Sequence, residues 1–248
     1  MFNALHGLSV VLCFVIFGLG GVFIRYFILI FPEHFIKDEE KRLKVCSEIL
    51  QKSWILFAKI LKFFKIIKVD DNQAERLKTI KNSIIVSTHP CFLDVVVLMS
   101  IIPYTTCFAA EKIGKNIFFK GMAELLFVLE SEDTQVWEKN ALDKLEKGFN
   151  VLIFPMGGRH KKDEHPKIRK GAAHLAQKSG KNIVMLKLEM SYEFLTRNQP
   201  IYEIRPDAPE YDMRYLGEIN TKEMLEKYPD EVTFKQKVTD LIKKTLYQ

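Results

Sequence analysis

Apolar residues fill the first part of the chain almost without interruption. Within residues 4–31 only His6 and Arg25 are strongly polar, and residues 8–24 are apolar or small throughout. About 20 apolar residues are enough for a helix to cross a bilayer, so the run predicts a membrane anchor. A buried core helix is the alternative. A cleaved signal peptide is disfavoured, because the run lacks a basic start and a small-x-small cleavage site before Pro32.

The segment that follows, about residues 39–67, has apolar positions at steps of three and four, as in an amphipathic helix. Its remaining faces carry lysines. A basic amphipathic helix can lie in a membrane interface, or it can pack its apolar face on its own domain, and both readings are open here. The apolar positions are Leu43, Cys46, Leu50, Trp54, Phe57, Ile60, Leu61 and Phe64, and the lysines are Lys52, Lys59, Lys62 and Lys65.

Beyond residue 70 short β-rich runs alternate with helical ones. The pattern predicts an α/β fold, with a mixed, partly parallel sheet flanked by helices. We therefore expect an anchor over residues 1–36, a basic amphipathic helix over 37–70 and a folded domain over 71–248. The strands are expected at 84–88, 105–109, 125–129, 150–154, 182–188, 201–205 and 213–216, and the helices at 93–101, 135–147, 171–178 and across most of 221–246.

Composition and charge narrow the class of protein. The chain has 248 residues, of which 48% are hydrophobic and 27% charged, so it is neither disordered nor collagen-like. Its cysteines form no CxxC pair, which disfavours a disulfide scaffold and favours a reducing compartment. The net charge of +6 suits an anionic partner, such as a phosphate-bearing lipid surface, nucleic acid or an acidic carrier protein. Basic residues follow the apolar run and none precedes it, so the folded domain is expected on the cytoplasmic side.

A histidine and an aspartate five positions apart join a predicted strand to a predicted helix. Pro90 disfavours a helical conformation at His89 and suits a first helical position, which predicts His89 as the helix N-cap. The ring can then fold back towards Asp94. The carboxylate would bind one ring nitrogen and leave the other free as a general base. A histidine that only caps a helix is the alternative.

A glycine pair and an arginine follow the predicted strand at 150–154. Gly157 and Gly158 allow backbone N–H groups to approach an anion, and Arg159 offers a planar fork for phosphate. An ordinary turn with a solvated basic loop is the alternative. The basic residues that follow are His160, Lys161, Lys162, Lys167, Arg169 and Lys170.

Taken together, these segments resemble the glycerolipid acyltransferase family that includes bacterial 1-acylglycerol-3-phosphate acyltransferases. The family's His-x4-Asp motif is matched by His89 and Asp94, and its second region by Lys112 and Gly121. The order and spacing of the motifs agree over roughly residues 84–190.

Two later segments extend the resemblance. FPMGGR at residues 154–159 stands where the family usually has FPEGTR, and KGAAHLA at 170–176 is close to its RGAAHLA-like helix start. HPCFLDVVVL, KNIFFKG and FLTRNQPIYEIRPDAPEYDMRYLGE are also similar to acyltransferases that accompany aryl-polyene lipid biosynthesis in Gram-negative bacteria. Met156 replaces the family's Glu and the second-region Arg has no match, which leaves the identity of the acceptor open.

The resemblance implies a membrane-bound O-acyltransferase whose catalytic domain occupies residues 71–248. It would move a fatty acyl group from an acyl thioester, of acyl carrier protein or coenzyme A, to a hydroxyl of a lysophospholipid or lipid-like acceptor. His89 would be the general base, oriented by Asp94, and backbone N–H groups near His89 would stabilise the oxyanion. The expected substrate-binding residues are Lys112, Gly157, Gly158, Arg159 and Lys170.

Other readings remain. A catalytically impaired relative that binds acyl carrier protein or lipid as an adaptor is the alternative from another class, and a thioesterase or lipid hydrolase is a third. A nucleophilic Cys91 is disfavoured at a helix start. No cofactor, metal or nucleic-acid partner is expected, the expected location is the bacterial inner membrane, and the oligomeric state is not predicted.

Overall fold

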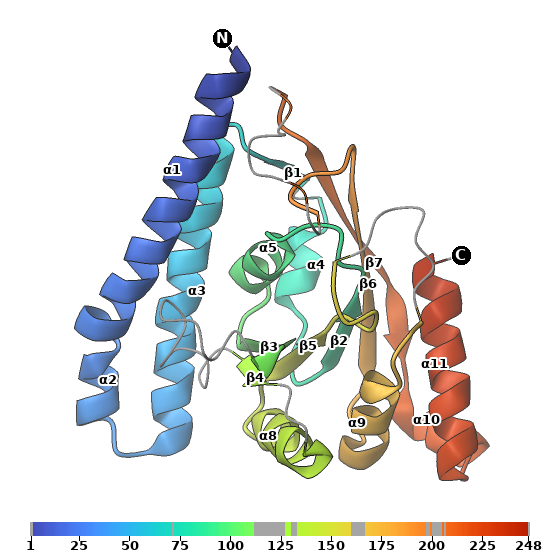
Figure 1. The fold of residues 1–248 in the computed structure, drawn as a ribbon. Coiled ribbons are helices and arrows are strands. Elements are labelled where there is room, and N and C mark those ends of the chain that lie inside the picture. Colours follow the sequence, from blue (N-terminus) through green and yellow to red (C-terminus); the bar gives the residue numbers. More distant parts are fainter. Residues whose placement is uncertain are drawn as a thin grey trace.

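The apolar N-terminal run forms a bent helix. The computed structural model describes residues 2–70, 72–111, 127–129, 133–159, 167–196, 199, 205 and 207–247. Helix α1 (Phe2–Phe23) continues through the π-helical turn η1 (Ile24–Ile28) into α2 (Ile30–Phe35). Arg25, the one strong charge that interrupts the run's second half, pairs with Glu33 at 2.6 Å. The chain then reverses, and α3 (Glu39–Phe63) returns beside α1 (Figure 1).

Local hydrogen bonds fix both ends of α3. Asp38 caps its start, because the side chain accepts from the backbone N–H of Lys41 at 2.7 Å. At the other end Lys65 adopts a φ of 53°, and the N–H of Ile66 reaches the carbonyl of Leu61 at 2.9 Å. This left-handed turn ends the helix before the predicted boundary at residue 67.

The apolar face of α3 is buried within the protein. Trp54 and Phe57 pack against Phe17 of α1, with ring centroids 5.5 and 4.8 Å apart, and the same face contacts α5. Of the two readings left open by the sequence, packing on the protein's own core is therefore the observed one for this face. Leu56 and Phe63 project outward from the helix and are 60% and 80% exposed.

The sheet is mixed and mostly parallel, as the sequence predicts. Its seven strands lie in the order β1-β7-β6-β2-β5-β3-β4. The five strands from β6 to β4 are parallel to one another, β7 is antiparallel to β6, and β1 is parallel to β7. Their bounds are β1 Lys68–Val69, β2 Ile84–Ser87, β3 Thr105–Ala109, β4 Phe127–Leu129, β5 Asn150–Ile153, β6 Ile183–Met190 and β7 Glu210–Ile219.

Helices cover both faces of this sheet (Figure 1). One buried cluster joins α1, α3, α4 and α5 to one face, and a second joins α8, α9 and α11 to the other. Alternation along β2 serves both clusters, since Ile85 belongs to the first and Ile84 and Val86 to the second. The helical bounds are α4 Ala74–Lys78, α5 Asp94–Ile101, α8 Thr134–Glu146, α9 Gly171–Ser179, α10 Thr221–Lys227 and α11 Glu231–Tyr247.

Most of the predicted elements lie close to their observed bounds. Residues 221–246, expected to be mostly helical, form α10 and α11. The strand predicted at 201–205 lies outside the described residues, apart from residue 205. The short elements β1 and α4 were not predicted. The three-part division of the chain stays a prediction.

The prediction that Pro90 occupies the first helical position, with His89 as the N-cap, is wrong. Helix α5 begins at Asp94, and its N-cap is Leu93. The chain from Cys91 makes a turn first, in which the N–H of Asp94 approaches the carbonyl of Cys91 at 3.4 Å. This turn, rather than a helical cap, folds the chain between the histidine and the aspartate.

Asn150, at the start of β5, joins three backbone groups from two neighbouring loops. Its side chain accepts from the N–H of Ser83 at 3.0 Å and donates to the carbonyls of Ile80 at 3.2 Å and Pro103 at 3.0 Å. The residue is 1% exposed. Water therefore does not substitute for the amide when it is removed.

We expect Asn150→Ala to lower the free energy of unfolding by about 2–4 kcal/mol, because it leaves buried backbone groups unpaired. Urea denaturation in detergent measures the change. Asn140→Ala, at an exposed position of α8, is the matched control and should stay within about 0.5 kcal/mol of the parent. Equal effects of the two substitutions would contradict this role of Asn150.

Candidate active site

Several loops and the beginning of one strand meet at the edge of the sheet where the parallel strands end. Strands β2 and β5 pair in parallel, with Val86 opposite Ile153, and β6 lies parallel to β2 on its other side. The chains that leave these strands therefore emerge together. Strand β7 runs the other way and begins at this edge, where Tyr211 lies opposite Met190.

The structure brings the predicted histidine and aspartate together at this edge. His89 Nδ1 lies 2.6 Å from Asp94 Oδ2, and the side chains are 15% and 0% exposed. The ring of His89 stacks on Phe154, with centroids 4.0 Å apart and planes 16° apart. Within the described chain, the other ring nitrogen, Nε2, has no hydrogen-bond partner. The ring of His89 is thus held by Asp94 at Nδ1 and by Phe154 on one ring face, and Nε2 is available to accept a proton.

Asp94 has two further hydrogen-bond donors. The backbone N–H of Cys91 donates to Oδ2 at 2.9 Å, and the hydroxyl of Tyr211 donates to Oδ1 at 2.5 Å. Both carboxylate oxygens are therefore satisfied without solvent. Sequence reasoning missed Tyr211, which lies 117 positions from Asp94 and within a strand. No local spacing signals such a contact.

The loop that carries His89 is fastened to the strand and loop beside it. Thr88 Oγ1 donates to the carbonyl of Leu188 at 2.8 Å and accepts from its N–H at 2.7 Å. The N–H of Phe92 donates to the carbonyl of Leu195 at 3.3 Å. These bonds hold the loop in place before any substrate binds.

The same bonds consume the backbone donors that were expected to stabilise an oxyanion. The N–H of Cys91 is held by Asp94, that of Phe92 by Leu195, and that of Leu93 by Cys91 Sγ at 3.4 Å. These three loop N–H groups are therefore already engaged, and the expectation that N–H groups at the helix start stabilise an oxyanion stays a prediction.

The glycine turn after β5 lies beside the histidine. The N–H of Gly157 donates to the carbonyl of Phe154 at 2.9 Å, so the residue that stacks on His89 also closes this turn. Gly157 has a φ of 76°, and a Cβ placed there would lie 2.7 Å from the guanidinium carbon of Arg169. Both facts favour glycine at this position. Met156, within the turn, is half-buried.

Arg159 lies close to the histidine loop. Its Nη1 donates to the carbonyls of Leu195 at 2.9 Å and Thr196 at 3.3 Å, and its guanidinium carbon lies 5.4 Å from the ring centre of Phe92. Part of the guanidinium is thus held by loop carbonyls, while its charge stays at the edge where His89 lies. Gly158, between the turn and Arg159, has open space around it.

The structure does not connect the remaining predicted site residues, Lys170 and Lys112, with the His89–Asp94 pair. Lys170 is exposed at the N-cap of α9, and within the described chain it makes no contact with the pair. Lys112, with Gly121 of the same predicted region, lies outside the described residues.

Cys91 is suited to packing rather than to nucleophilic attack. It is completely buried, and burial together with the nearby Asp94 carboxylate raises the pKa of its thiol well above the ordinary value. A thiol that stays protonated is a weak nucleophile. This agrees with the sequence-based preference against a cysteine mechanism.

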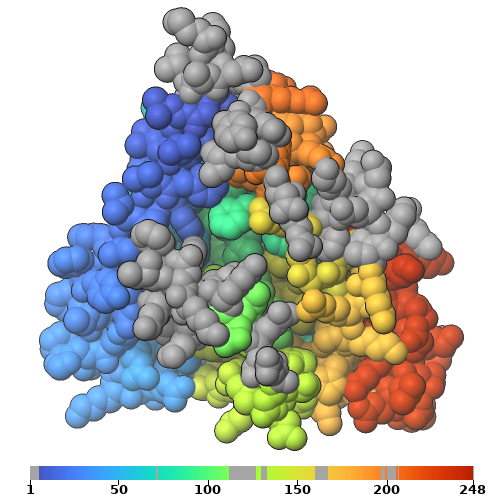
Figure 2. All heavy atoms as spheres, in the orientation of Figure 1, coloured from blue at the N-terminus to red at the C-terminus, as the bar shows by residue number. Residues whose placement is uncertain are grey.

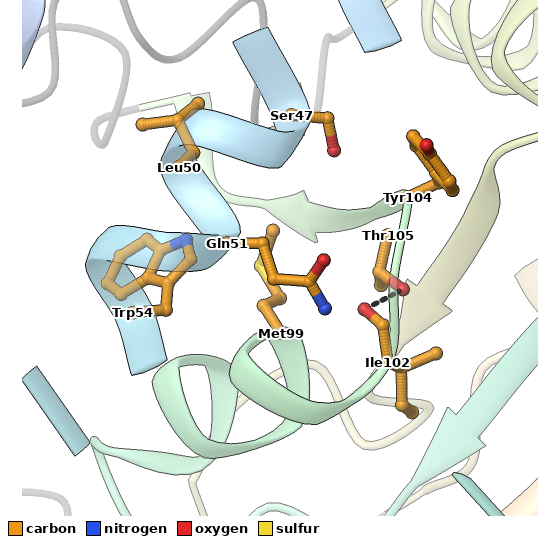
Figure 3. Close-up of a pocket in the computed structure, with 8 residues that line it drawn as sticks. All are labelled: Ser47, Leu50, Gln51, Trp54, Met99, Ile102, Tyr104 and Thr105. Carbon is orange, nitrogen blue, oxygen red and sulfur yellow. Dashed lines mark hydrogen bonds between the residues drawn. The ribbon is translucent and has the colours of Figure 1, made fainter. Parts of the chain in front are cut away.

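A small pocket lies apart from the histidine, between α3, α5 and the start of β3 (Figure 3). The buried indole N–H of Trp54 has no partner there. The pocket contains no acid–base pair, so it is not the candidate active site. The residues that line the pocket are Ser47, Leu50, Gln51, Trp54, Met99, Ile102, Tyr104 and Thr105.

Among the described residues, no group of three or more His, Cys, Asp or Glu side chains is placed to hold a metal ion.

The apolar N-terminal helix contacts the histidine loop. The helical run over residues 6–35 is long and apolar enough to cross a membrane. In its most apolar window the mean hydropathy is 2.5, and 11% of the window is buried inside the protein. Phe14 of α1 packs against Phe92, with ring centroids 5.7 Å apart. In the space-filling view the chain between β2 and α5 lies between α1, in blue, and the chain after β5, in yellow (Figure 2). The exposed apolar residues of the run are Leu8, Val11, Leu12, Val15, Ile16, Leu19, Phe23, Tyr26, Phe27, Ile30, Phe31 and Phe35.

Comparisons with known proteins agree with this arrangement. A family model described as Acyltransferase matches residues 68–188, the stretch from β1 into β6 that contains the histidine pair and the glycine turn. The crystal structure of the 1-acyl-sn-glycerophosphate (LPA) acyltransferase PlsC from Thermotoga maritima has the same fold. The TM-score is 0.71 at 17% identity, covering 98% of this chain and 95% of that one. The search of curated proteins finds no match.

The glycine turn yields a matched pair of substitutions. We expect Gly157→Ala to lower the free energy of unfolding by about 1–2 kcal/mol, because alanine is strained at positive φ and Arg169 must move aside. Gly158→Ala, where an added Cβ meets nothing within 4 Å, should change it by less than about 0.5 kcal/mol. Thermal denaturation of both variants in detergent measures the difference. A loss as large for Gly158→Ala as for Gly157→Ala would contradict it.

Proposed function

We propose that this chain, whose residues 68–188 match the acyltransferase family model, transfers a fatty acyl group from an acyl thioester to a hydroxyl of a lysophospholipid-like acceptor. The observation that carries this proposal is the His89–Asp94 pair, in which a fully buried carboxylate holds one ring nitrogen and the other nitrogen remains free. The structurally similar protein from Thermotoga maritima is itself described as an LPA acyltransferase.

The reaction follows from the position of the free nitrogen. His89 Nε2 takes the proton of the acceptor hydroxyl as its oxygen attacks the carbonyl carbon of the thioester. The tetrahedral intermediate expels the thiolate, which regains the proton from the imidazolium, so that an ester and a free thiol result. Asp94 keeps the ring in its reactive orientation and stabilises the imidazolium between these two steps. No acyl-enzyme is needed, because both substrates bind together.

The glycine turn and Arg159 are the proposed site for an anionic headgroup. The positive charge of Arg159 lies beside the loop of His89, and Gly157 and Gly158 leave the backbone open to an anion. Met156 has no group that hydrogen-bonds a hydroxyl, so the acceptor is recognised mainly through its negative charge. Lys112 and Lys170 stay predicted contributors.

The exposed apolar face of α1 and α2 is the proposed membrane-binding surface. The contact between Phe14 and Phe92 then keeps the histidine loop near the bilayer, where a lipid acceptor and its product reside. We place the domain at the cytoplasmic side of the bacterial inner membrane. There either acyl carrier protein or coenzyme A can present the thioester to the basic protein.

We expect His89→Ala to reduce acyl transfer by about 100-fold or more, because the reaction loses its general base. The purified protein in detergent receives palmitoyl-acyl carrier protein or palmitoyl-coenzyme A with a panel of lysophospholipids, and mass spectrometry identifies the products. The matched control is His174→Ala. His174 also pairs with a carboxylate, Glu138, at 2.6 Å, but it packs against the other face of the sheet and should keep its activity.

Each outcome has a distinct meaning. A fully active His89→Ala protein would rule out the proposed base. Release of free fatty acid without a diacyl product would indicate a hydrolase. A folded protein that makes no product with any donor would favour the adaptor reading, or a lipid-like acceptor of the kind used in aryl-polyene lipid synthesis.

A further inference from the structure

We propose that Tyr211 is a positioning residue: its hydroxyl binds the ionised Asp94 carboxylate and thereby favours the form of the His89–Asp94 pair in which His89 is neutral and accepts a proton. This inference rests on the proposed function, in which His89 is the general base. It concerns a residue from β7, outside the segment that matches the acyltransferase family model.

Among the described residues, the hydroxyl of Tyr211 has one polar partner at the site. Its ring is 0% exposed, and its hydroxyl donates to Asp94 Oδ1 at 2.5 Å. The other oxygen, Oδ2, serves His89 Nδ1 and the backbone N–H of Cys91. Tyr211 is therefore the side-chain donor that meets this carboxylate on the side away from the histidine.

A carboxylate that is shielded from solvent needs hydrogen-bond donors to stabilise its ionised form. Burying an ion is costly, and donors to an ionised acceptor offset more of that cost than donors to a neutral one. Tyr211 stays available as a donor, because burial and the neighbouring Asp94 carboxylate raise the pKa of its phenol well above the ordinary value.

The direction of the effect on His89 follows from the charges of the pair. With His89 neutral, the pair carries one negative charge, and after proton uptake it carries none. The tyrosine hydroxyl binds an uncompensated carboxylate more strongly than one already neutralised by imidazolium. It therefore favours the unprotonated pair and lowers the pH at which the pair takes up its proton.

The other ionisable groups near the pair do not supply this effect. The Cys91 thiol is neutral, since burial raises its pKa, and Arg159 is a constant positive charge that acts on the same thiol. Both remain unchanged when only the hydroxyl of Tyr211 is removed. The difference between tyrosine and phenylalanine at this position therefore isolates the hydrogen bond.

The test is Tyr211→Phe, which keeps the ring and removes the hydroxyl. We expect the titration midpoint of the His89 ring, followed by NMR in substrate-free enzyme and assigned with His89→Gln, to rise by about one pH unit. The acid limb of the rate–pH profile should move up in the same direction. Tyr215→Phe is the matched control, because Tyr215 lies on the same strand and packs against the same core cluster but does not contact Asp94.

Two further measurements separate this role from packing. In an Asp94→Asn background, Tyr211→Phe should leave the His89 titration unchanged, because no carboxylate charge remains to be stabilised. Site-specific 3-fluorotyrosine at position 211 is a stronger donor and should lower the midpoint. It retains the ring and the hydroxyl, so it decides the question even if Tyr211→Phe fails to fold.

An unchanged His89 titration in folded Tyr211→Phe overturns the inference, whatever lipid the enzyme makes. So does an unchanged midpoint with 3-fluorotyrosine. A shifted titration in a protein that transfers no acyl group overturns the proposed function and leaves the role of Tyr211 intact. The two failures are therefore distinguishable.

Discussion

A carboxylate with no solvent exposure, that of Asp94, is the constraint on which the rest of the site depends. An ion in this position is tolerated only if its lone pairs meet donors with good geometry. Those donors come from its own loop, through His89 and Cys91, and from the distant strand β7, through Tyr211. The antiparallel strand contributes to the site because it begins where the parallel strands end, and it thereby brings Tyr211 to this edge.

The same edge gathers the groups that surround the histidine. Parallel pairing delivers Phe154 from the end of β5 to the face of the His89 ring, and the chain after β6 delivers the carbonyl of Leu195 to both Phe92 and Arg159. Phe92 also contacts the apolar helix α1. The loop with the reactive nitrogen is therefore bordered by an aromatic platform, a cation and an apolar surface. These three features fit the proposed acceptor, a lipid with an anionic headgroup.

Contacts between residues that are close in the sequence could be predicted, whereas contacts between distant residues could not. The His89–Asp94 pairing is local, so spacing and Pro90 suggested it, with a capping histidine as the alternative, and the His-x4-Asp resemblance supported it. The turn through Cys91 that produces the pairing was mistaken for a helix cap. Alternation of strands and helices predicted a mixed sheet, but two residues at β1 and five at α4 are too few to show a period. Tyr211 could not be found in this way, because its hydroxyl acts across 117 positions from a strand whose pattern reports only burial.

The burial of Asp94 also bears on the choice between an enzyme and an adaptor. Replacing a buried ionic network with apolar residues of similar volume is often neutral or stabilising, so stability alone does not explain why this one persists. Binding a lipid or a carrier protein does not require it either, since the groups proposed for such binding are Arg159, the basic surface and the apolar helix. A buried carboxylate with each oxygen bonded, turned towards a histidine whose second nitrogen is free, has a use only if that nitrogen must gain and lose a proton. On this argument we favour the enzyme over the adaptor, and we propose that Met156, in place of the family's Glu, alters the acceptor rather than the proton transfer.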